Sequence, residues 1–222
     1  MSRDFFKNYV KNLPNNFSSR ENENTRLFEN INKALKFLNK KLIEPGTRLL
    51  DLGSGNGSFY EYCLSKKIIC DKLDGAFDNI NFEDSKLNLK QDTYDFVYIN
   101  SVIEHLNDPK NILIEIKKVL KVGGVLIIIT PNFKYAYKNF YDDPTHLRAY
   151  SHVSIYKLLQ IFEFKNIEIL PFLINKPNFF WKVPFKFFLA GMIPFKNHTY
   201  KKLPIPNFLR GNSTAMMVFC EK

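Results

Sequence analysis

A glycine-rich turn at 51–57, with the sequence DLGSGNG, constrains the fold of this chain more than any other feature. It follows the apolar run 47–52, which predicts a buried strand, and it precedes a segment that predicts a helix. Glycines at such a strand-to-helix turn let a nucleotide-type ligand approach the backbone closely. The spacing differs from the dinucleotide fingerprint, because Gly57 stands one position early and Ser58 occupies the fingerprint position. This argues against a nicotinamide reductase, and the Gly-Lys-Ser/Thr of a P-loop is absent.

Strands and helices alternate along the rest of the chain. Apolar runs predict strands at 47–52, 67–73, 94–101, 125–130, 166–170 and 215–220. Periodicity predicts helices at 22–42, 57–66, 108–120 and 151–162. Asp108-Pro109 is expected to start the third helix and Gly123-Gly124 to end it. This order predicts an α/β fold whose largely parallel sheet is covered by helices.

Two segments differ from this pattern in composition. Residues 1–21 are polar and irregular, so we expect a flexible leader followed by a single domain over 22–222. Residues 171–212 hold seven basic residues, ten aromatics, six prolines and no Asp or Glu, which places most of the net charge of +10 there. We expect an insertion before the last strand. Its composition suits a lid on the core, a contact with an anionic membrane surface or lipid substrate through 176–210, a nucleic-acid contact or an oligomer interface.

The turn and four later segments resemble the class I S-adenosylmethionine-dependent methyltransferase superfamily. The acid-x-G-x-G-x-G pattern at 51–57 resembles its motif I. In the same order follow segments resembling its F-D-x-V, E-H-L, L-K-P-G-G and T-P-N stretches: YDFV at 94–97, IEHL at 103–106, LKVGG at 120–124 and ITPN at 129–132. The resemblance covers about 47–170. It implies a Rossmann-like, doubly wound, mostly parallel seven-stranded sheet with helices on both faces, and S-adenosylmethionine as cofactor.

The resemblance also implies which residues bind the cofactor. The motif I residues are Asp51, Gly53, Ser54, Gly55 and Gly57. An acid ending the second strand, Asp71 or Asp74, is expected at the ribose, and an acid after the third strand, Glu83 or Asp84, near the adenine. Asn100 and Ser101, at the end of the next strand, complete the set. The interval between the ribose and adenine candidates leaves little room for the family's usual second helix.

A second polar group, DPTHLRAYS at 143–151, resembles a D-P-T-H-x-R stretch of a small-molecule or glycan-type branch of these enzymes. His146 is the expected general base, since imidazole titrates near neutral pH. Asp143, Arg148 and Tyr150 are expected at the substrate, with Arg148 binding an anionic group. His105 is the second catalytic candidate, because ligands of open α/β sheets bind at the carboxyl ends of the strands. The alternative interpretation, in which these residues only hold turns, stays open.

No metal site is predicted. Asp142 and Asp143 offer too few oxygen ligands for a divalent cation, with Asn132 as the sole further candidate. The three cysteines lack metal-ligand spacing, and their odd number favours a reducing compartment.

The expected reaction is methyl transfer to a small acceptor, a hydroxyl of a sugar, glycan precursor or lipid-linked molecule. The alternatives are quinone-type O-methylation at a membrane surface, RNA methylation, and a non-catalytic scaffold with this fold. RNA is disfavoured, because the basic residues cluster with Pro and Phe and no RNA-binding module is visible. The N-terminus lacks the apolar core of a secretory signal, and no window reaches about 18 apolar residues. We therefore expect a cytoplasmic protein, with peripheral membrane contact as an option and no indication of its oligomeric state.

Overall fold

The computed structural model describes residues 17–173, 182–183, 185, 195–197 and 210–222. Its helices and strands are α2 (Phe17–Phe37), β1 (Arg48–Leu52), α3 (Ser58–Ser65), β2 (Ile69–Leu73), β3 (Tyr94–Asn100), η1 (Ile103–His105), α4 (Lys110–Val119), β4 (Leu120–Pro131), α5 (Phe133–Ala136), η2 (Phe140–Asp142), α6 (His152–Ile161), β5 (Lys165–Pro171), β6 (Phe195–Asn197), β7 (Arg210–Ser213) and β8 (Ala215–Glu221). Most of 171–212, where the lid or membrane contact was expected, lies outside the described residues.

The main sheet is six-stranded, in the order β2-β1-β3-β4-β8-β5. Strands β2, β1, β3 and β4 pair in parallel, whereas β8 runs antiparallel between β4 and β5. This confirms the Rossmann-like, mostly parallel arrangement. The seven-strand prediction is wrong for the described residues, because 74–93 folds into turns and forms no strand beyond β2. That segment is polar, and few of its side chains are buried, so it lacks the apolar alternation that a strand needs.

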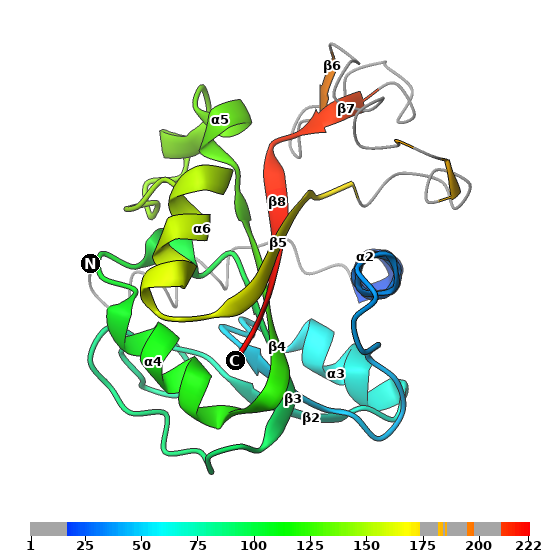
Figure 1. Ribbon diagram of the computed structural model, residues 1–222, viewed down its shortest axis with the longest axis vertical. Coiled ribbons are helices and arrows are strands. Elements are labelled where there is room, and N and C mark those ends of the chain that lie inside the picture. The colour runs from blue at the N-terminus through cyan, green and yellow to red at the C-terminus, as the bar shows by residue number, and fades with distance from the viewer. Residues whose placement is uncertain (1–16, 174–181, 184, 186–194, 198–209) are drawn as a thin grey trace.

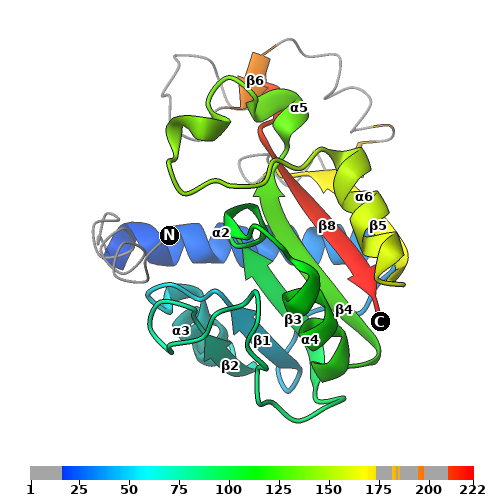
Figure 2. The ribbon, with the colours of Figure 1, turned by 90° about the vertical axis from the view of Figure 1, so that its left-hand side faces the viewer.

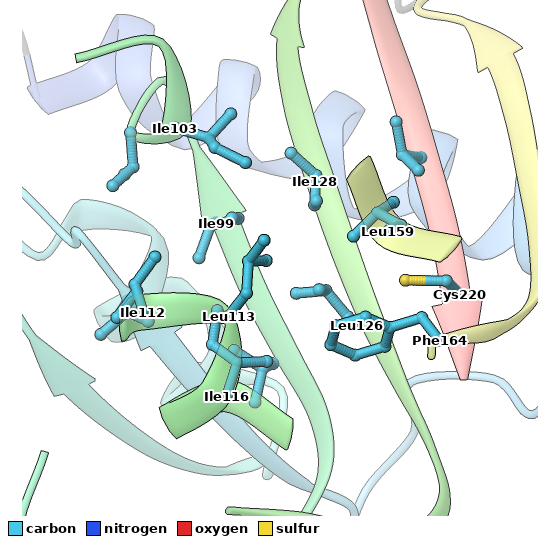
Figure 3. Close-up of a cluster of buried hydrophobic side chains, with 14 of the residues drawn as sticks. Ile99, Ile103, Ile112, Leu113, Ile116, Leu126, Ile128, Leu159, Phe164 and Cys220 are labelled. Carbon is cyan, nitrogen blue, oxygen red and sulfur yellow. The ribbon is translucent and has the colours of Figure 1, made fainter. Parts of the chain in front are cut away.

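Helices cover both faces of the sheet, as predicted (Figure 1). The alternation of side chains along β3 explains why: Phe96 and Tyr98 join the core under α2 and α3, while Val97 and Ile99 join the core under α4 and α6. Figure 3 shows the second of these cores, where Ile112, Leu113 and Ile116 of α4 meet Leu126 and Ile128 of β4. A sheet buried on both faces accounts for the nearly continuous apolar runs of its strands.

Three element boundaries differ from the sequence-based expectation. Helix α2 begins at Phe17, inside the predicted leader, and ends at Phe37 instead of near 42. Helix α4 ends at Val119, and Gly123-Gly124 lies within β4 and not at the end of the helix. The pairing of β3 with β4 shifts register beside these glycines, and a side chain on Gly124 would come within 3.0 Å of the Tyr94 carbonyl. The glycines therefore permit a close strand contact.

The sheet determines where a ligand meets the chain. Strands β1, β2, β3 and β4 run in the same direction, so their carboxyl ends meet at one edge (Figure 2). The loops after these strands carry most of the predicted site residues. None of the described helices is long and apolar enough to cross a membrane.

Candidate cofactor and acceptor site

The turn after β1 has a backbone conformation that requires its glycines. Gly53, Gly55 and Gly57 have φ angles of 78°, 55° and 78°, in the left-handed region that favours glycine. A side chain on Gly53 would also lie 2.2 Å from a methyl carbon of Val102, and one on Gly57 would lie 2.8 Å from the Lys72 amine. Glycine therefore suits the backbone at all three positions, and a side chain at Gly53 would collide with Val102.

Asp74, directly after β2, stabilises this turn by accepting backbone hydrogen bonds. One carboxylate oxygen accepts the Gly55 N–H at 2.8 Å, and the other accepts the N–H groups of Ala76 and Phe77. The N–H groups of Gly53 and Ser54 donate to the Leu73 carbonyl. These backbone donors are therefore already paired within the protein. The expectation that glycines here let a ligand approach the backbone closely does not require these N–H groups to bind it.

Asp51, the acid of the motif, lies beneath the turn with a partnerless oxygen. Its side chain is buried, and its Oδ2 atom has no hydrogen-bond partner. Burial, reinforced by the negative charge of Asp74, raises the pKa of Asp51 from 3.8 to about 7. The Asp74 carboxylate and the Lys72 amine both lie close enough to act on Asp51. The partnerless oxygen of Asp51 can pair with a positively charged group, and S-adenosylmethionine carries a sulfonium and an amino group.

The raised pKa of Asp51 predicts a pH dependence of stability. The folded chain holds a proton on Asp51 that the unfolded chain has lost, so this contribution is complete below about pH 4 and is lost as the pH rises to about 7. A shift of about three pH units corresponds to roughly 4 kcal/mol at most. We expect Asp51→Asn to flatten the free energy of unfolding between pH 4 and 7, measured by urea denaturation against wild type. Parallel curves for the two proteins would refute the prediction.

The remaining cofactor candidates lie in different parts of the structure. Asn100 and Ser101 lie at the carboxyl end of β3, and Ser101 has a φ of 53°. Glu83 accepts the N–H groups of Asn107 and Asp108, which ties the 74–93 segment to the entry of α4. Asp71 lies within β2, before the carboxyl edge of the sheet, and its carboxylate accepts a hydrogen bond from the Tyr94 hydroxyl at 2.9 Å. Asp84 is exposed and bonds its neighbours Asn81 and Ser85. The structure therefore brings Asp74, and not Asp71, to the glycine turn.

A second cluster joins the two segments that sequence analysis treated separately. The backbone carbonyl of Glu104 in η1 accepts the N–H groups of Leu147 and Arg148 at 2.9 and 3.0 Å. His105 points its Nδ1 atom at the Thr145 carbonyl, 3.1 Å away, and at the Thr145 hydroxyl, 2.8 Å away. The E-H-L and D-P-T-H segments thus form one polar cluster.

His146 and Asp143 complete this cluster. The Nδ1 atom of His146 lies 2.6 Å from the Phe140 carbonyl, so Nδ1 carries the hydrogen, and the ring stacks on Phe140. The His105 and His146 rings have centroids 4.9 Å apart. The Nε2 atom of His146 lies 4.0 Å from Asp143 Oδ2, while Asp143 Oδ1 accepts the N–H and hydroxyl of Thr145. Burial lowers the pKa of His105, which keeps this imidazole neutral at physiological pH.

Glu104, which sequence analysis did not single out as a site residue, is the most enclosed member of the cluster. Its side chain is fully buried, with Oε2 accepting the Thr130 hydroxyl at 2.9 Å and Oε1 lacking a partner. Burial raises its pKa to about 7. The E-H-L pattern was its only sequence signal, because the local sequence does not indicate that this charged side chain is buried.

The last two substrate candidates differ in exposure. Arg148 is exposed, and its guanidinium lies beside the Tyr150 hydroxyl. Tyr150 is buried in the core beneath α4 and α6, and burial raises the pKa of its hydroxyl to about 12. Tyr150 therefore packs as a core side chain and is not exposed at the surface.

The cofactor turn and the polar cluster are neighbours. Gly53 lies against Val102, and Val102 precedes η1, which carries Glu104 and His105. Val102 carries no local sequence signal of this role, because its contact is with a glycine 49 positions away. The site thus consists of a tight, acid-backed turn with a histidine-rich cluster beside it.

This fold and site define an α/β protein with a tight glycine turn and a histidine-rich cluster at the carboxyl edge of its sheet. The model of the methyltransferase domain family matches residues 19–169, and the chain belongs to this family. A curated relative, an uncharacterized protein of Methanocaldococcus jannaschii, is 29% identical over 141 residues, which are 56% of this chain and 67% of the relative.

Solved structures share the fold. A SAM-dependent methyltransferase of Archaeoglobus fulgidus superposes with a TM-score of 0.60 at 20% identity, over 91% of this chain and 94% of that one. The phosphoethanolamine N-methyltransferase 2 of Haemonchus contortus, solved with S-adenosyl-L-methionine, gives a TM-score of 0.54 at 14% identity, over 87% of this chain and 52% of that one. The protein is an S-adenosylmethionine-dependent methyltransferase. The crowded glycine turn and the partnerless oxygen of Asp51 fit that cofactor.

Proposed function

We propose that this methyltransferase acts on a hydroxyl of a small acceptor, namely a sugar, a glycan precursor or a lipid-linked molecule. The observation that carries the proposal is the pair of imidazoles beside the cofactor turn, with ring centroids 4.9 Å apart. A hydroxyl acceptor must lose its proton during methyl transfer, and an imidazole is the side chain best matched to that task near neutral pH.

The residues of the cluster have different roles in the proposed methyl transfer. S-adenosylmethionine supplies a methyl group that its sulfonium already activates. His146 holds its hydrogen on Nδ1, so Nε2 is the atom that accepts the hydroxyl proton. The Asp143 carboxylate lies 4.0 Å from this Nε2 atom. The exposed Arg148 nearby suits an acceptor that carries a phosphate or another anionic group.

Transfer of labelled methyl groups tests the proposal. We expect the full chain with methyl-labelled S-adenosylmethionine to methylate hydroxyl acceptors in a panel of nucleotide sugars, lipid-linked sugars, quinols, phosphoethanolamine and RNA. Mass spectrometry of the product then locates the methyl group. Methylation of nitrogen in phosphoethanolamine, with no methyl ether from any hydroxyl acceptor, would overturn the proposal.

Two alternatives give different products in the same panel. A quinol acceptor would indicate the quinone-type reaction, and methylation that requires vesicles of anionic lipid would indicate contact through 176–210. Methylated RNA, with activity falling steeply as salt rises, would indicate an RNA methyltransferase. The net charge of +10 is compatible with either anionic partner, and the exposed Arg148 beside the cluster favours a small anionic acceptor.

A further inference from the structure

Glu104, His105 and His146 converge in a way that their assigned roles do not explain. Each offers one atom suited to bind a metal, and these three atoms lie within 4.8 Å of one another. Glu104 and His105 are adjacent in η1, and the fold brings His146 to them from the loop that follows η2. Ligands of a single first-row cation lie about 2.0–2.2 Å from it, so two ligand atoms of one ion are at most about 4.4 Å apart. The three atoms, within 4.8 Å of one another, therefore need to move by only a small amount to share one ion.

Both imidazoles are held in place by contacts at Nδ1. Nδ1 of His105 faces the Thr145 carbonyl at 3.1 Å, and Nδ1 of His146 faces the Phe140 carbonyl at 2.6 Å. A backbone carbonyl accepts a hydrogen bond, so both rings carry their hydrogen on Nδ1 and their lone pair on Nε2. Histidine ligands of metals are usually held by this second hydrogen bond, which sets the tautomer and the orientation of the ring.

Glu104 supplies an independent observation that points to a cation. Its side chain is fully buried, and Oε1 has no hydrogen-bond partner. A buried carboxylate oxygen without a partner is costly. Thr130 holds the other oxygen at 2.9 Å, which fixes the orientation of the carboxylate. A cation bound among the three side chains would supply the missing partner.

We propose that Glu104, His105 and His146 bind one divalent first-row transition-metal ion, such as Mn²⁺ or Zn²⁺. Two imidazoles and one carboxylate suit such ions better than Mg²⁺ or Ca²⁺, which prefer oxygen ligands. The residues suggested by the sequence are engaged elsewhere: Asn132 caps α5, and Asp142 accepts a hydrogen bond from Asn139. The proposal therefore places a metal where sequence analysis expected none.

Three protein ligands leave open positions on the ion, and this gives the site a role in the reaction. An acceptor hydroxyl in an open position becomes more acidic and gives its proton to solvent water. The electron pair of its oxygen then forms the bond to the methyl carbon, while the pair of the carbon–sulfur bond stays on sulfur. This role rests on the proposed hydroxyl acceptor. With the ion bound, His146 is a ligand and solvent water takes the proton, because Nε2 cannot bind the ion and accept the proton at once; without the ion, His146 keeps the role of base given above.

Metal binding can be measured without any acceptor, which separates this proposal from the proposed function. The full chain, stripped with a chelator and dialysed, is titrated with MnCl₂ and with ZnCl₂ by calorimetry, and its bound metal is counted by elemental analysis. We expect one ion per chain for wild type. Glu104→Gln and His146→Ala should each weaken binding at least tenfold. His152→Ala, which changes an exposed histidine at the start of α6, is the matched control and should bind as wild type does.

Each outcome decides the matter. No stoichiometric binding to wild type, or equal binding to His146→Ala, would overturn the metal site even if a methyl ether forms in the transfer assay. One ion per chain, lost in both cluster variants and kept in His152→Ala, would support the site even if the acceptor is not a hydroxyl. Circular dichroism of the variants shows whether each one is folded, so a loss of binding is scored only for folded protein.

Discussion

Gly53→Ala is expected to weaken S-adenosylmethionine binding at least tenfold and to destabilise the fold by about 2 kcal/mol or more. The backbone at Gly53 has a φ of 78°, and the left-handed conformation alone costs a side-chain-bearing residue about 1–2 kcal/mol. The new methyl would also lie 2.2 Å from a methyl carbon of Val102, so the turn has to move. Calorimetric titration and urea denaturation of the variant measure the two effects.

Two further variants separate backbone strain from the clash. Gly46→Ala has the same backbone problem, with a φ of 87°, but nothing lies within 4 Å of its new side chain. It should lose stability and keep wild-type cofactor affinity. Val102→Ala in the Gly53→Ala background removes the colliding methyl group and should restore part of the affinity. Wild-type affinity and stability in Gly53→Ala would contradict the described geometry of the turn.

His146→Ala is expected to lower kcat by about 100-fold to 10,000-fold, the range that a positioned proton acceptor contributes. Where His146 is instead a ligand of the proposed ion, the variant loses that ligand and kcat is expected to fall as well. The affinity for S-adenosylmethionine should stay within about twofold of wild type, because His146 belongs to the cluster and not to the glycine turn. Initial rates with the acceptor identified by methyl transfer measure the first effect, and calorimetry measures the second.

The control for this variant is His152→Ala, which removes an imidazole that faces solvent at the start of α6. Its kcat should equal that of wild type. Asp143→Asn keeps the shape of the side chain and removes the charge 4.0 Å from His146, so an intermediate kcat is expected. A His146→Ala enzyme with wild-type kcat would show that this histidine only holds its turn.

The sequence predicted the α/β class of fold because long apolar runs and one glycine turn indicate it directly. Strands β1 to β4, and the two helical layers, follow from runs whose burial is continuous or periodic. The missing seventh strand was not predictable in this way, because that number came from the family resemblance, while 74–93 is a polar segment that folds into turns. Gly123-Gly124 looked like a helix end, yet its role depends on the neighbouring strand β3.

The candidate site was predictable as a set of segments and not as a geometry. The glycine turn, His105 and His146 were each recognised, but the hydrogen bonds that join 104–105 to 145–148 connect residues about 40 positions apart. The ribose candidates Asp71 and Asp74 lie close in sequence, and their difference depends on how they lie relative to the end of β2. The burial of Glu104, on which the metal proposal depends, appears only once the chain is folded.

The central claim is that the turn at 51–57 holds S-adenosylmethionine. The most direct test is a calorimetric titration of S-adenosylhomocysteine, and separately of NADH, into the purified full chain. We predict one molecule of S-adenosylhomocysteine bound per chain with micromolar affinity and no heat of binding from NADH, since Gly57 stands one position before the third glycine of the dinucleotide fingerprint. Binding of NADH, or no binding of S-adenosylhomocysteine, would contradict the account.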